Sequence, residues 1–135
     1  MAGLDDMKTY PNGVKILKWS RQEKPTAESV AELMKGFGFK VYDLQTCPPW
    51  FVRSRHAHDD EEVRGAVSGT ITFHFDDYPV TFEGGDILVI PGGIAHEVII
   101  HNDQPFVAYK GSASGERKVS EKGDGKGSIE DLARR

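Results

Sequence analysis

The chain has 135 residues, of which 38% are hydrophobic and 28% charged, and its formal net charge is −4 at pH 7. This length fits a single domain that buries about two thirds of its unfolded surface. The acidic balance argues against a general nucleic-acid binder, because phosphate contacts require clustered Lys and Arg side chains. No apolar run reaches the roughly 18 residues of a membrane-spanning helix, so we expect no membrane partner.

Cysteine usage and the N-terminus favour a cytoplasmic protein. The first residues, Met-Ala-Gly-Leu-Asp-Asp, are too polar for a signal peptide. The single cysteine, Cys47, rules out an internal disulfide framework and fits a reducing compartment. Because Cys47 precedes Pro48-Pro49, we interpret it as a packing residue beside a turn rather than as a nucleophile.

The N-terminal third is predicted to hold an arm, a short strand and a helix. Residues 1–13 form a loosely ordered arm that ends at the Pro11-Asn12-Gly13 turn, and residues 14–19 alternate as a strand does. A helix is expected over about residues 26–36, with Thr26 as its N-cap. Its apolar face follows helical spacing through Ala27, Val30, Leu33, Met34 and Phe37.

From residue 39 the hydrophobic pattern changes to a period of two. Strands are predicted over residues 39–46, 50–55, 62–68, 70–75, 78–82, 86–90, 96–101 and 106–110. Many short strands separated by Gly and Pro turns indicate an all-β sandwich or barrel, here over residues 14–110. Residues 111–135 are rich in Gly, Ser and mixed charge, which predicts a flexible polar C-terminal tail.

Four side chains within the strand region form a potential set of metal ligands: His56, His58, Glu62 and His96. Alternate residues of a strand share a face, so His56 and His58 would project side by side, and Glu62 keeps their parity. His96 must arrive from a distant strand. Imidazole nitrogens and a carboxylate oxygen suit transition metals better than Ca²⁺ or Mg²⁺. We therefore expect one divalent transition metal, Fe²⁺ first, with Ni²⁺, Mn²⁺, Zn²⁺, Co²⁺ and Cu²⁺ as alternatives.

The spacing around these ligands resembles the two motifs of the cupin superfamily, G-x5-H-x-H-x3-4-E-x6-G and G-x5-P-x-G-x2-H-x3-N. Beyond the four ligands, the matching positions are Gly69, Gly85, Pro91 and Gly93. The resemblance covers about residues 50–110 and departs at Trp50, where the family has Gly, and at Ile100, where it has Asn. It implies a double-stranded β-helix, or jelly-roll barrel, with one short N-terminal helix, and a homodimer by analogy.

Strand parity predicts which residues surround the metal. The residues that share a face with the four ligands are Val52, Ser54, Arg64, Ala66, Ser68, Val98 and Ile100. The cavity is therefore expected to be mostly apolar, with Arg64 as its one inward cation. A buried Arg is costly unless paired, so Arg64 either pairs with Glu62 or Asp86 or awaits an anionic substrate. His74 and His101 are interpreted as polar surface residues.

The segment from His58 to Arg64 also resembles acireductone dioxygenase, a cupin. That resemblance implies that His56, His58, Glu62 and His96 hold the metal and that Arg64 contacts the substrate or supports a ligand. The leading hypothesis is a metal-dependent dioxygenase of a small chelating enediol, diketone or thiol. Two alternatives stay open: a metal-dependent isomerase or decarboxylase, with Glu62 or an unliganded His as base, and a non-catalytic cupin that binds a small ligand or a structural metal.

Overall fold

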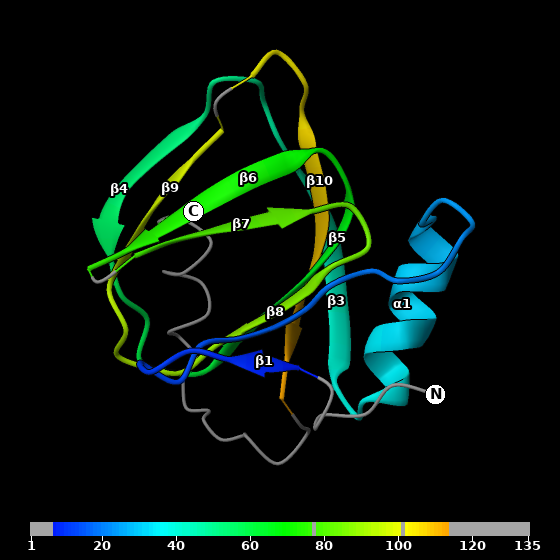
Figure 1. Ribbon diagram of the computed structural model, residues 1–135, viewed down its shortest axis with the longest axis horizontal. Coiled ribbons are helices and arrows are strands. Elements are labelled where there is room, and N and C mark those ends of the chain that lie inside the picture. The colour runs from blue at the N-terminus through cyan, green and yellow to red at the C-terminus, as the bar shows by residue number, and fades with distance from the viewer. Residues whose placement is uncertain (1–6, 77, 101, 114–135) are drawn as a thin grey trace.

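The computed structural model describes residues 7–76, 78–100 and 102–113 as two antiparallel β-sheets with one short helix (Figure 1). The sheets face each other, and the helix lies against the larger sheet (Figure 1). The predicted all-β architecture with a single N-terminal helix is therefore confirmed. Residues 1–6 of the predicted arm, His101 and residues 114–135 of the predicted tail lie outside the described residues.

The strands alternate between the two sheets in a way that brings distant segments together. The larger sheet has the order β1 (Lys8–Thr9), β2 (Lys15–Leu17), β8 (Ile87–Ile90), β5 (Glu62–Ser68), β10 (Phe106–Ser112) and β3 (Lys40–Cys47). The smaller sheet has the order β4 (Val52–His56), β9 (His96–Ile99), β6 (Thr70–Phe75) and β7 (Pro79–Glu83). Strand β1 lies within the predicted arm, and β10 continues to Ser112, two residues beyond the predicted boundary.

Helix α1 (Ala27–Gly36) begins where the sequence predicts. Thr26 is its N-cap: the Thr26 hydroxyl accepts from the Ser29 amide at 3.0 Å, and the Ser29 hydroxyl accepts from the Thr26 amide at 2.8 Å. The helix buries Val30 and Met34 against β5 and β3. In the described part of the chain, no helix has the length and apolarity that a membrane crossing requires.

Alternation along the strands of the larger sheet creates two apolar layers. Leu88 and Ile90 of β8 join the core between the sheets, whereas Ile87 and Val89 pack in the layer beneath α1. Strand β5 has a glycine under the helix, and a Cβ at Gly65 would collide with Met34 Sδ. The helix thus braces one face of β5 closely, while Glu62 and Arg64 point to the opposite face, toward the second sheet.

Turn geometry explains the glycine positions of the two sequence motifs. Gly69 and Gly85 have φ values of +90° and +93°, a region that side chains disfavour. Trp50, which stands where the cupin motif has glycine, has a φ of +61° and is the one described non-glycine residue with positive φ. The chain therefore keeps the left-handed turn before β4 with a tryptophan, at a cost of about 1–2 kcal/mol.

Candidate metal centre

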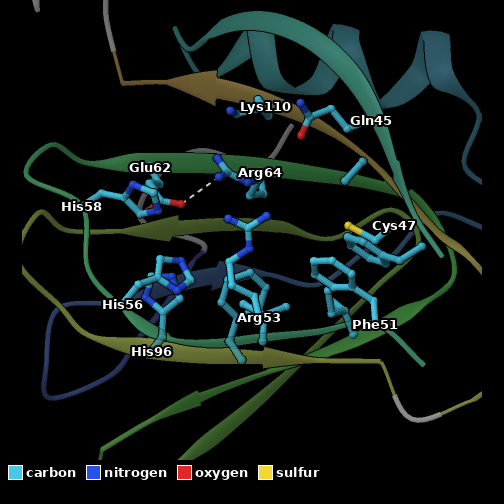
Figure 2. Close-up of a pocket in the computed structure, with 15 residues that line it drawn as sticks. Gln45, Cys47, Phe51, Arg53, His56, His58, Glu62, Arg64, His96 and Lys110 are labelled. Carbon is cyan, nitrogen blue, oxygen red and sulfur yellow. Dashed lines mark ion pairs between the residues drawn. The ribbon is translucent and has the colours of Figure 1, made fainter. Parts of the chain in front are cut away.

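Three histidines from two neighbouring strands converge at one end of the space between the sheets. His56 at the end of β4 is the register partner of His96 at the start of β9, and His58 follows two residues after β4. One potential ligand atom from each residue lies within 4.8 Å of the others. The ring centroid of His56 lies 4.5 Å from that of His96 and 5.0 Å from that of His58. Figure 2 shows the rings of all three side by side with Glu62.

Backbone carbonyl groups fix the tautomers of two of these rings. His56 Nδ1 lies 2.8 Å from the Ser54 carbonyl oxygen, and His96 Nδ1 lies 3.0 Å from the Ile94 carbonyl oxygen. Because a carbonyl oxygen only accepts, each Nδ1 must carry the proton and donate it. The Nε2 atoms of His56 and His96 then keep their lone pairs, which is the state that a metal requires.

Glu62 lies beside the histidines, and each of its two carboxylate oxygens has a close nitrogen neighbour. Its Oε1 is 2.8 Å from Arg64 Nη2, and its Oε2 is 2.8 Å from His58 Nε2. Oε2 is buried and accepts no well-oriented hydrogen bond from any described residue. A buried carboxylate oxygen that contacts an imidazole nitrogen without a well-oriented hydrogen bond fits a bound cation. The residues present thus suit a divalent transition metal, and Glu62 as its fourth ligand stays a prediction.

Burial keeps the candidate nitrogen ligand of β9, His96, neutral. His96 is 1% exposed, and this burial lowers its pKa to about 4, against the opposing effect of its hydrogen bond to Ile94. Burial also lowers the pKa of the Arg64 guanidinium to about 10, so this side chain remains charged at neutral pH. The centre therefore presents a neutral imidazole and a cation that is ion-paired to Glu62.

A cavity of about 90 Å³ opens from the histidines between the two sheets (Figure 2). Its apolar wall comes from both sheets and consists of Phe51, Ile71, Phe73, Val98, Phe106 and Ala108. The mostly apolar wall agrees with the sequence prediction, and so do the inward positions of Arg64 and Val98. Ala66 is buried in the core between the sheets, Ile100 is buried there too, and neither lines the cavity.

The predicted face of β4 is wrong. Val52 is 57% exposed and Ser54 is also exposed, whereas Arg53 lines the cavity. The cause is a register irregularity between Arg53 and His56 in the pairing of β4 with β9. One extra residue in a strand reverses the faces on either side of it, so odd-numbered residues point inward before this bulge and His56 points inward after it.

The cavity also holds polar side chains that the sequence interpretation missed: Gln45, Cys47, Arg53 and Lys110. Arg64 is therefore not the one inward cation. Lys110 could have been found, because it shares parity with the buried Phe106 and Ala108 of β10. Arg53 could not, because nothing in the sequence marks the bulge. Cys47 has a pKa raised by burial, which two nearby arginines partly offset, so it is a thiol at neutral pH.

Asp86 and His74, two further residues that the sequence analysis weighed, lie away from the cavity. Arg64 pairs with Glu62 and not with Asp86, whose carboxylate accepts instead from Lys18 Nζ at 2.6 Å and from the Trp19 amide at 2.9 Å. His74 on β6 pairs with Glu97 of β9 in register, and it does not line the cavity.

Two facing antiparallel sheets that hold three histidines at one end of an internal cavity define a cupin-type β-sandwich with a candidate metal site. Residues 44–109 match the Cupin_2 family, described as a cupin domain. The chain therefore carries a Cupin_2 domain. A comparison with curated proteins found no match.

Several solved structures are similar to this chain. A cupin-2 domain containing protein from Shewanella frigidimarina is 25% identical, with 55% of this chain and 67% of that one covered and a TM-score of 0.46. A salicylate 1,2-dioxygenase variant from Pseudoaminobacter salicylatoxidans is 28% identical over 50% of this chain, with a TM-score of 0.48, and only 20% of that chain is covered. A DUF861 family protein from Thermotoga maritima is 20% identical, with 72% and 96% covered and a TM-score of 0.48.

Proposed function

We propose that this protein is a metal-dependent enzyme of the dioxygenase type that acts on a small chelating substrate, an enediol, a diketone or a thiol. The observation that carries the proposal is the cluster of His56, His58 and His96, whose ligand atoms lie within 4.8 Å of one another at the wall of an apolar cavity. Three or four protein ligands leave coordination positions open, as catalytic metal sites require.

In this proposal the chain's own residues hold the metal, orient its carboxylate ligand and keep water out of the cavity. His56, His58 and His96 would hold the metal with Glu62 as the fourth ligand, and Arg64 keeps the Glu62 carboxylate in place through its 2.8 Å ion pair. When bound, a redox-active divalent metal supplies Lewis acidity and the electron transfer that O₂ chemistry needs. The apolar wall excludes water from reactive species.

The test is O₂ uptake by the full chain loaded separately with Fe²⁺, Ni²⁺ and Mn²⁺. The substrate panel is a reductone-type enediol, acetylacetone and cysteine, one for each chemical class. We expect O₂ consumption with at least one of them by the wild type and by His74→Ala, a matched histidine variant away from the cavity. The variant His58→Ala should lose O₂ consumption, because the substitution removes a metal ligand.

Other results would redirect the assignment. Turnover that needs the metal but no O₂ would replace the dioxygenase with a Lewis-acid isomerase or decarboxylase. Tight binding of a panel compound without turnover would indicate a non-catalytic cupin. The cytoplasmic location expected from the single cysteine belongs to the same proposal.

A further inference from the structure

Arg53 is a cation in the cavity for which no described residue supplies an ion pair. Its Nη1 atom is buried and makes no hydrogen bond to any described residue. The guanidinium carbon lies 5.7 Å from the centroid of the Phe51 ring, which supports the side chain but does not satisfy its N–H groups. In Figure 2 the Arg53 side chain rises from β4 into the cavity, between the histidine cluster and the end formed by Phe51 and Cys47, with its guanidinium directed toward Arg64.

The charges that line this cavity do not balance. Among the described residues that line it, Arg53, Arg64 and Lys110 are cationic and Glu62 alone is anionic. Glu62 is already committed to Arg64 at 2.8 Å. Burial lowers the pKa of Arg53, and the like charge of Arg64 lowers it further. A partly buried guanidinium beside a second one is costly unless an anion compensates it.

We propose that Arg53 binds the carboxylate group of the substrate, so that the substrate class is a small organic acid. This inference rests on the proposed function in one respect, that the other end of the acid reaches the histidine cluster. Arg64 is not the primary anion receptor, because its guanidinium is engaged by Glu62. The N–H groups of Arg53 form a planar fork that matches a carboxylate. Lys110, the register partner of Arg64, adds positive charge to the same cavity.

The size and wall of the cavity narrow the class further. Its volume of about 90 Å³ is well below the roughly 300–1,000 Å³ of sites for drug-sized ligands. Apart from the cations, Gln45, Cys47 and the candidate metal ligands, the lining is aliphatic and aromatic. A small acid with a carboxylate for Arg53 and a short, weakly polar remainder matches these walls.

Carboxylate binding can be tested without metal. The full chain is treated with EDTA at pH 8, where free imidazole is neutral, and titrated calorimetrically with acetate, pyruvate, lactate and inorganic phosphate. Pyruvamide is the uncharged control for pyruvate. We expect a carboxylate to bind, pyruvamide to bind far more weakly, and Arg53→Met to weaken carboxylate binding by roughly 30-fold or more.

Arg55→Met is the matched control variant. Arg55 lies on the same strand but is exposed and pairs with Asp76, so its loss should leave carboxylate binding unchanged. A second readout uses the unmodified protein: Cys47 is the single cysteine and lines the cavity, so a bound carboxylate should slow its alkylation by iodoacetamide. This readout does not depend on how a variant folds.

Four results would overturn the inference: no carboxylate in the panel binds, pyruvamide binds as well as pyruvate, phosphate binds more tightly than every carboxylate, or Arg53→Met and Arg55→Met weaken binding equally. Failure of the proposed function would look different. In that case carboxylates would still bind and protect Cys47, but the metal-loaded protein would consume no O₂.

Discussion

The ion pair between Arg64 and Glu62 gives the sharpest prediction on stability. The two side chains are 18% and 10% exposed, and Arg64 Nη2 lies 2.8 Å from Glu62 Oε1. Arg64→Met retains most of the apolar stem but leaves the Glu62 carboxylate buried without its cation. Breaking a buried pair in this way costs about 3–5 kcal/mol, a large fraction of the roughly 5–15 kcal/mol that stabilises a typical domain.

The assay is urea unfolding of the metal-free protein, followed by tryptophan fluorescence. The double variant Glu62→Gln/Arg64→Met removes both charges, so it should lose much less free energy of unfolding than the sum of the two single variants. Saturation with Zn²⁺ should also shrink the loss in Arg64→Met, because the bound cation lies beside the same carboxylate.

The control is Arg55→Met, which breaks the pair between Arg55 and Asp76 on the surface. Solvent screens that pair, so the variant should unfold almost as the wild type does. The reasoning is refuted if Arg64→Met lowers the free energy of unfolding by less than about 1 kcal/mol, as the loss of an exposed pair would. It is also refuted if the double variant loses as much free energy of unfolding as the two single variants together.

Three further predictions concern acid stability, backbone strain and assembly. His96 has a pKa near 4 in the folded state and about 6.5 when unfolded, so the unfolded chain binds the proton first. The metal-free protein should therefore lose up to about 3 kcal/mol of stability as pH falls from 6.5 to 4, and His96→Gln should flatten this slope in urea unfolding at each pH. Trp50→Gly should relieve the positive φ of +61° and raise stability by about 1 kcal/mol; a lower melting temperature in calorimetry would contradict this. Tyr42 and Leu44 are exposed on the edge strand β3, so we expect a homodimer by light scattering that Leu44→Lys weakens; a wild-type monomer at all concentrations would rule it out.

The strands and the ligand cluster could be predicted because both depend on local patterns. Period-two alternation marks β5 and β6 with their observed bounds, and motif spacing groups His56, His58 and His96. The cavity lining was predicted only in part. A single bulge in β4 exchanges the positions of Val52 and Arg53, and a bulge depends on the pairing of β4 with β9, which sequence periodicity does not encode.

Cys47 illustrates a second limit. Its neighbours Pro48 and Pro49 indicate a turn, and the strand does end there, but only the pairing of β3 with β10 places the thiol on the cavity side. Local signals therefore define where an element ends, whereas the surroundings of a side chain follow from the packing of two sheets.

The most direct test of the central claim, that the three histidines form a metal site, is the metal content of the purified full chain by elemental mass spectrometry. The metal content of the wild type is compared with that of His58→Ala and with that of His74→Ala, which changes a histidine outside the cavity. We predict about one transition metal ion per chain in the wild type and in His74→Ala, and strong loss in His58→Ala. Equal metal content in the two variants, or no metal in the wild type even after reconstitution, would contradict the account.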